Sequence, residues 1–118
     1  MRDYTKYEIW NLGIELSVKI FRITGEFPNE EKFGLTSQIS RALVSIFSNI
    51  TEGASRSSEK VFNRFIEIAF GSSFELKSQI LLAGRLNYTE SQNIEELIKE
   101  IDLISKKLNA LRNKLNRN

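Results

Sequence analysis

Five polar side chains within residues 35–54 have the spacing of one helix face. They follow one another three, four, four and three residues apart: Gln38, Arg41, Ser45, Asn49 and Glu52. A helix aligns such residues along its axis, here directly beside its apolar side. The next segment offers a second polar set: Ser72, Glu75 and Gln79. If the two faces meet, Arg41 and Glu75 suit a bidentate guanidinium–carboxylate pair.

This polar stripe (Gln38, Arg41, Ser45, Asn49, Glu52, Ser72 and Glu75) has two interpretations. In the first, Glu52 and Glu75 are paired carboxylates that perform acid–base catalysis in a polar cleft. In the second, the stripe is a hydrogen-bonded network that fixes the register of the helices. The structural interpretation is favoured, because a catalytic site normally also needs a nucleophile, a metal or an anion cradle. We therefore expect no catalytic residue and no enzyme activity.

The chain of 118 residues contains neither histidine nor cysteine. The usual zinc and di-iron sites, and nucleophilic sites of the Ser-His-Asp and Cys-His kinds, need these residues. We expect no cofactor and no metal site, with carboxylate-only Mg²⁺ or Ca²⁺ sites formally open. No signal sequence is visible at the N-terminus, and no apolar run approaches the roughly 20 residues of a membrane span. Together with the lack of cysteine, this favours a cytoplasmic protein that has no contact with membranes.

Apolar periodicity predicts four helices, over residues 7–24, 35–54, 59–86 and from Thr89 to near the C-terminus. The last segment carries a heptad pattern: Ile94, Leu97, Ile101, Ile104, Leu108, Leu111 and Leu115. Gly25 is predicted to cap the first helix, and Thr89 with Gln92 to form a capping box that opens the last. Short connections force consecutive helices to be antiparallel. We predict one all-α domain over residues 1–118, an antiparallel up-down-up-down four-helix bundle.

Some large apolar side chains exceed what a four-helix core needs: Val44, Phe47, Phe70, Phe74 and Leu81. They lie beside the main apolar stripes of their helices, so each helix is apolar around much of its circumference. Surplus apolar faces either widen the core or form an interface with another molecule. The residues alone do not decide between these two.

Basic side chains gather in two stretches, one around the connection between the second and third helices and one after Ser105: Arg56, Lys60, Arg64, Lys106, Lys107, Arg112, Lys114 and Arg117. Cations complement the macrodipole at a helix C-terminus, and the formal net charge is only +2. A solvated charged face is thus the plainer interpretation. The alternative is contact with the phosphates of RNA or DNA. No aromatic residues alternate with these basic runs, so base stacking is not expected.

Three spaced motifs carry a family resemblance: Phe27-Pro28-x-x-Glu31-x-x-Gly34-Leu35-x-x-Gln38, Ser45-Ile46-x-x-Asn49-Ile50-x-Glu52-Gly53 and Gly71-Ser72-x-x-Glu75-Leu76. With Trp10, they make the whole chain resemble the four-helix-bundle proteins encoded within intervening sequences of bacterial large-subunit ribosomal RNA genes. These proteins are related in fold to the accessory variability proteins of diversity-generating retroelements. Two residues depart from the family pattern: Phe47 replaces a usual proline and Thr51 a usual alanine.

The resemblance implies a protomer of a closed homo-oligomer, a homopentameric ring, with no established enzymatic activity. It favours the interface interpretation of the surplus apolar side chains. The retroelement relatives bind nucleic acid and a reverse transcriptase through a positively charged surface of their ring. Three functions stay open: an oligomeric RNA- or DNA-binding accessory protein, a scaffold that docks another protein, and an enzyme that uses Glu52 and Glu75. The first is favoured.

Overall fold

The computed structural model describes residues 2–116, which form four α-helices and two short 3₁₀-helices. In chain order these elements are η1 (Tyr4–Lys6), α1 (Glu8–Thr24), η2 (Asn29–Glu31), α2 (Leu35–Ala54), α3 (Glu59–Arg85) and α4 (Ser91–Asn116). The prediction of an all-α chain with four helices is confirmed, and the predicted helix bounds agree within about two residues.

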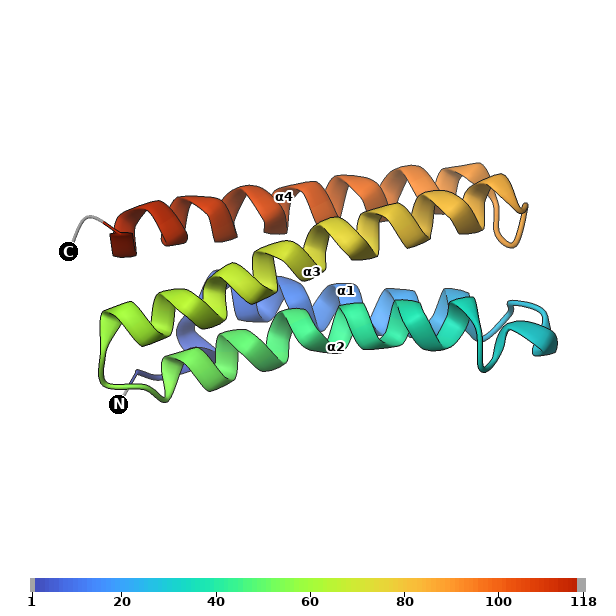
Figure 1. Ribbon diagram of the computed structural model, residues 1–118. Coiled ribbons are helices and arrows are strands. Elements are labelled where there is room, and N and C mark those ends of the chain that lie inside the picture. The colour runs from blue at the N-terminus through green and yellow to red at the C-terminus, as the bar shows by residue number, and fades with distance from the viewer. Residues whose placement is uncertain (1, 117–118) are drawn as a thin grey trace.

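The helices form a rod of 45 × 23 × 20 Å, with their connections at its two ends (Figure 1). Polar contacts between α3 and α4 join residues in opposite order along the two helices: Asn63–Asn116, Ser73–Ser105 and Lys77–Asp102. These two helices are therefore antiparallel. Helix α3 packs along both α2 and α4, while α1 packs on α2 and α4 and lies diagonally across from α3.

The core is built from the apolar stripes that the periodicity predicted. Its largest fully buried side chains come from all four helices: Leu16, Ile20, Ile39, Leu43, Ile46, Ile50, Phe62, Ile66, Leu76, Ile80, Leu97 and Ile101. Each such side chain contributes about 1.5–3 kcal/mol by leaving water. The helices are consequently held together by this shared interior, and their outer faces are free to carry function.

The connection between α3 and α4 is fixed by a left-handed residue, Asn87, with a φ of 60°. Its N–H donates to the carbonyl of Gly84 (3.0 Å), and the N–H of Tyr88 donates to the carbonyl of Ala83 (3.1 Å). This pair of bonds is a Schellman motif with asparagine in the position that glycine usually takes. At the end of α1, by contrast, Gly25 caps the helix at a φ of −60°, which any residue can adopt.

Tyr88 also ties this connection to the segment before α2. Its ring lies 5.3 Å from that of Phe27, and its hydroxyl donates to Glu31 Oε2 at 2.5 Å. Glu31 Oε1 accepts from the N–H of Leu35 at 3.2 Å. The Tyr88 hydroxyl, and after it this backbone N–H, lower the pKa of Glu31 below its ordinary value. The same hydrogen bond raises the pKa of Tyr88.

The predicted capping box of Thr89 and Gln92 is wrong. Helix α4 begins at Ser91, so Thr89 stands one position too early to be the residue that caps the first turn. Its hydroxyl accepts instead from the side-chain amide of Asn93 at 2.8 Å. The side chain of Gln92 points along the helix and donates to Glu96 at 3.5 Å.

Helices α2 and α3 approach each other closely at Gly53. A Cβ atom at this position would lie 2.8 Å from Phe62 Cδ1 and 2.8 Å from Phe65 Cβ. Phe65 Cβ is attached directly to the backbone of α3 and cannot rotate away. Glycine is therefore required here by the packing of α3, because any side chain would push the two helices apart.

We predict that Gly53→Ala lowers the free energy of unfolding by about 1–3 kcal/mol, the usual range for overpacking. This loss should appear although alanine is intrinsically the better helix residue by about 1 kcal/mol. Urea denaturation followed by circular dichroism measures the change. The matched control is Gly71→Ala in α3, where no described atom lies within 4 Å of the new Cβ. That variant should gain about 0.5–1 kcal/mol. Equal stabilisation of both variants would contradict the close approach at Gly53.

Candidate functional site

The centre of the polar stripe is a hydrogen-bonded junction between α2 and α3. The hydroxyls of Ser45 and Ser72 lie 2.7 Å apart, and Asn49 Nδ2 donates both to the Ser45 carbonyl (2.7 Å) and to its hydroxyl (3.0 Å). All three side chains are half-buried. The structure thus brings together three of the seven stripe residues, at the middle of the rod, where they satisfy one another.

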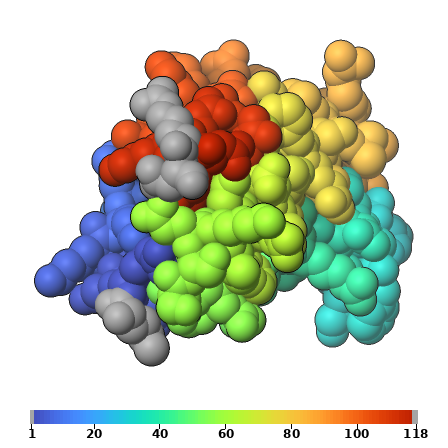
Figure 2. Space-filling view, turned by 60° about the vertical axis from the view of Figure 1, so that its left-hand side comes forward, coloured from blue at the N-terminus to red at the C-terminus, as the bar shows by residue number. Residues whose placement is uncertain are grey.

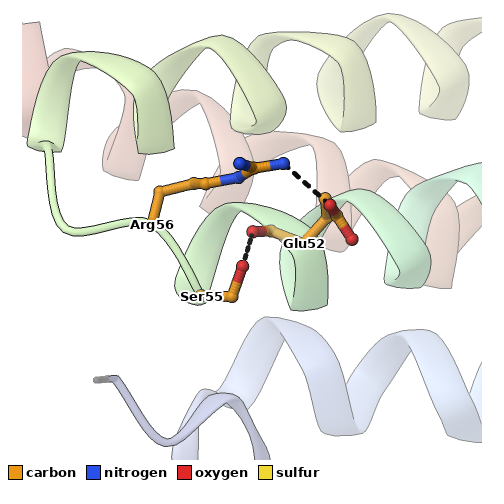
Figure 3. A network of polar contacts seen from close by, with 3 residues as sticks. All are labelled: Glu52, Ser55 and Arg56. Atoms are coloured by element: carbon orange, nitrogen blue, oxygen red, sulfur yellow. Dashed lines mark hydrogen bonds and ion pairs between the residues drawn. The ribbon is translucent and has the colours of Figure 1, made fainter.

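The remaining stripe residues are exposed and have separate surroundings. Glu75 accepts from Gln79 at 3.2 Å, and within residues 2–116 no ion pair joins it to Arg41. Gln38 and Arg41 face solvent. At the other end of the stripe, Glu52 pairs with Arg56 at 2.8 Å, as Figure 3 shows.

Glu52 and Glu75 are far apart along the rod. Gly53, next to Glu52, packs against Phe62 and Phe65, so Glu52 is level with that part of α3. Glu75 lies about ten residues further along α3, which at 1.5 Å per residue is about 15 Å. Acid–base catalysis by a carboxylate pair needs both groups at one substrate. The geometry does not provide such a pair at these two residues.

A second serine pair, which the sequence reasoning missed, connects α3 to α4 at the same level. Ser105 donates to Ser73 Oγ at 2.7 Å, and Ser73 donates to the Phe70 carbonyl at 2.6 Å. Ser73 is completely buried. The sequence could have indicated this burial, because Ser73 lies between Ala69 and Leu76 on the main apolar stripe of α3. We call the level defined by Ser45, Ser72, Ser73 and Ser105 the serine level.

The two predicted basic clusters meet at one end of the rod. The side chain of Asn63 donates to that of Asn116 at 2.5 Å, so the last turn of α4 lies beside the first turns of α3. Figure 2 shows the α2–α3 connection and the end of α4 next to each other at this end. We call this the basic end, with Arg56, Lys60, Arg64, Arg112 and Lys114 as its members from the predicted clusters.

The N-terminal segment adds to the basic end, which the sequence reasoning did not anticipate. Arg2 donates to the carbonyl of Arg56, and its guanidinium lies 4.6 Å from the centre of the Phe62 ring. Lys6 follows in η1. The prediction of antiparallel helices already implied this position, because the start of the first helix must then lie at the same end as the connection between the second and third helices.

The serine level divides the rod into halves of opposite charge. Helix α1 crosses this level near residue 14, since its ion pairs Glu8–Lys107 and Lys19–Glu100 fall on either side of Ser105. The half with the basic end carries nine Lys and Arg against five Asp and Glu (residues 2–14, 46–72 and 105–116). The other half carries seven against ten (residues 15–45 and 73–104). The small net charge of the chain therefore conceals a pronounced polarity.

The cations of the predicted clusters fall into two groups. Three of them pair with carboxylates: Arg56 with Glu52 at 2.8 Å, Lys107 with Glu8 at 3.1 Å and Arg112 with Glu67 at 3.8 Å. The others are exposed and form no ion pair in the part of the chain that the structure describes: Lys60, Arg64, Lys106 and Lys114. Arg117 lies outside the described residues. The second group is available to an external anion.

The five surplus apolar residues separate onto two surfaces. Phe74 (60% exposed) and Leu81 (46%) line a groove of 460 Å³ between α3 and α4, next to Lys77 and Asp102. The half-buried ring of Phe70 lies 4.9 Å from that of Phe74.

The second surface lies on the opposite flank, between α1 and α2. Phe47 is half-buried, and its Cβ would be 3.5 Å from a Cβ added at Gly13 of α1. Val44, 37% exposed, is three residues earlier on α2 and continues this surface outward.

Two further features bear on the kind of site. Across residues 2–116, no helix combines the length and apolar character needed to cross a bilayer. In the same range, no three carboxylates gather closely enough to hold a metal ion.

Comparisons with known proteins agree with this architecture. Residues 5–110 match the model of the 23S rRNA-intervening sequence protein family. A crystal structure at 1.70 Å of a protein of unknown function from the S23 ribosomal protein family, from Bacteroides thetaiotaomicron, is 26% identical with a TM-score of 0.81. The alignment covers 88% of this chain and 97% of that one. Among curated proteins, none matches. The resemblance seen in the sequence is confirmed: this chain belongs to the 23S rRNA-intervening sequence protein family.

Proposed function

We propose that this protein is a non-enzymatic, homo-oligomeric accessory protein that binds RNA through phosphate contacts at its basic end. The observation that carries the proposal is the meeting of two basic clusters, distant in the sequence, at one end of the rod. Lys60 and Arg64 come from the start of α3, and Lys114 comes from the end of α4. All three are exposed and form no ion pair within residues 2–116.

Phosphate binding gains its free energy largely from the release of counterions. Each phosphate that a lysine or arginine neutralises lowers the slope of log K against log salt by about 0.7 for a single strand and about 0.9 for a duplex. A handful of contacts from one basic end gives weak binding. Several basic ends on one assembly give much stronger binding, because one RNA can contact them simultaneously.

Homo-oligomerisation supplies this repetition, and the two apolar surfaces support it. A closed ring of up-down-up-down bundles joins one surface of each copy to a different surface of the next. The α3–α4 groove at Phe74 and the α1–α2 flank at Val44 lie on opposite flanks and could meet in this way. Cyclic symmetry then brings the basic ends of all copies to the same face of the ring. Five copies are what the family resemblance implies.

A second candidate function is a scaffold that docks another protein. The supporting observation is Phe33, which is 89% exposed in the α1–α2 connection, at the end opposite the basic one. Leu82 and Leu86, near the end of α3, are 49% and 44% exposed. Exposed aromatic and aliphatic side chains are typical of protein interfaces. This candidate becomes the leading one if the protein binds no RNA at low salt.

The binding proposal predicts that Lys60→Gln with Arg64→Gln weakens RNA binding and its salt dependence together. Loss of two phosphate contacts should reduce the magnitude of the slope of log K against log salt by about 1.4 for single-stranded RNA. Fluorescence anisotropy with a labelled RNA at several salt concentrations measures both quantities. The matched control is Arg85→Gln with Lys99→Gln, which removes the same charge from the other half of the rod. Equal effects of the two double variants, or wild-type binding that is indifferent to salt, would contradict the proposal.

The assembly proposal predicts that Phe74→Glu dissociates the oligomer, because it places a charge in an apolar contact. Light scattering coupled to gel filtration should give the wild type a multiple of the 13.6 kDa chain mass, and the variant the mass of one chain. Leu103→Glu on the outer face of α4, where Leu103 is 42% exposed, is the control and should keep the wild-type mass. A monomeric wild type would refute this part of the proposal.

A further inference from the structure

A small groove of 380 Å³ opens on the outer side of α3 at the basic end. Its lining consists of three apolar and two cationic residues: Val61, Phe65, Ile68, Arg56 and Arg64. No acidic side chain belongs to the described lining. Ile68 is 51% exposed and Phe65 is half-buried. The groove thus offers an apolar floor to a ligand and a positive rim to an anion.

The guanidinium of Arg56 packs against the ring of Phe65 rather than extending freely into solvent. Its Cζ atom is 5.1 Å from the centre of the Phe65 ring, within the range of a cation–π contact. Glu52 holds it there through a single bond, between Arg56 Nη2 and Glu52 Oε1 (Figure 3). A guanidinium has five N–H donors, so most of them stay available.

An aromatic ring and a guanidinium beside exposed aliphatic side chains form the kind of surface on which an unpaired nucleobase stacks. The base of a paired nucleotide is buried in its own helix and cannot enter such a groove. Arg64, at the rim and without an ion pair in residues 2–116, is placed to contact the phosphate of the same nucleotide. The charge of the rim excludes a cationic ligand, and the apolar floor gives an isolated inorganic anion little to bind.

We propose that this groove binds one unpaired nucleotide of RNA, with its base on Phe65, Ile68 and Arg56 and its phosphate at Arg64. The proposal rests on the proposed function and sharpens it, because it selects single-stranded over double-stranded RNA. It also differs from the expectation from sequence that no base would stack. That expectation rested on the lack of aromatic residues alternating with the basic runs, whereas the structure places the half-buried ring of Phe65 next to Arg56.

Helix register connects the groove with the polar stripe. Ser45 bonds to Ser72 across α2 and α3, and one helical turn nearer the basic end Asn49 and Ile68 lie level with each other. The hydrogen-bonding side chains at the centre of the stripe therefore begin where the groove ends. A strand that enters the groove with one base can continue over Asn49, Ser45 and Ser72, which lie between the exposed Glu52 and Glu75 along this face.

The test compares the affinity of the full protein for a single-stranded 12-nucleotide RNA and for a blunt duplex of the same sequence, by fluorescence anisotropy at low salt. Phe65→Leu keeps the apolar volume near Gly53 but removes the aromatic face. It should weaken single-strand binding at least about fivefold, and change duplex binding by less than about twofold. Phe33→Leu, an exposed phenylalanine at the opposite end, is the matched control and should change neither. Thermal unfolding of each variant verifies that the bundle is intact.

A second readout gives its main result with the unmodified protein, which does not depend on the folding of a variant. An RNA that carries 2-aminopurine at one unpaired position should lose fluorescence when the protein binds, since stacking quenches this base. Quenching should be weaker with Arg56→Lys, which keeps the charge but loses the planar group.

Three outcomes separate the proposals. Equal loss of single-strand and duplex binding in Phe65→Leu, or no loss of either, overturns the groove proposal while phosphate binding stands. Unchanged 2-aminopurine fluorescence on binding overturns it likewise. If the wild type binds neither RNA at low salt, the proposed function itself fails and the groove proposal falls with it.

Discussion

The close approach of α2 and α3 at Gly53 is the constraint on which the functional end of the molecule depends. Because no side chain separates the helices there, Phe62 and Phe65 of α3 lie directly on the backbone of α2. The short connection between α2 and α3 then places the Arg56 guanidinium next to the Phe65 ring and within bonding distance of Glu52. A larger residue at position 53 would displace the rings and the cations together. Packing in the interior and chemistry at the surface are therefore coupled at this point.

The charge polarity of the rod comes from side chains and not from the backbone. Figure 1 shows that α1 and α3 begin at the end of the rod where α2 and α4 finish, so their macrodipoles oppose one another and largely cancel. What remains is the distribution of lysine, arginine and carboxylate groups on either side of the serine level. Such a separation of charge orients an approaching polyanion toward one end before any specific contact forms. It also explains how a chain with a formal net charge of only +2 can present a cationic surface.

Apolar periodicity predicted the number of helices, their bounds and most of the core, because burial on one helix face leaves a regular signal. Apolar periodicity could not predict which residues of the polar stripe bond to one another. Ser45, Asn49 and Ser72 bond to one another, whereas Arg41 and Glu75 do not, and this difference depends on the distance between α2 and α3 along their length. The capping box failed for a related reason, since Thr89 belongs to a turn whose geometry is set by Asn87 and Tyr88.

The basic end was predictable in part. Both basic clusters were visible in the sequence, and antiparallel helices bring them to the same end. The contribution of Arg2, however, depends on its hydrogen bond to the Arg56 carbonyl, which no sequence pattern predicts. The separation of the surplus apolar residues onto two flanks was also hidden. Val44 and Phe74 are both surplus apolar residues on their own helices, and only the packing of all four helices puts Phe74 at the α3–α4 groove and Val44 on the α1–α2 flank.

The central claim, that RNA contacts one end of the molecule, is tested most directly by lysine footprinting. Acetylation of lysine amines is measured by mass spectrometry in the free protein and in the presence of RNA at low salt. The account predicts protection of Lys60 and Lys114, and unchanged acetylation of Lys32 and Lys99 in the other half of the rod. Equal protection of both halves, or protection confined to Lys32 and Lys99, would contradict it.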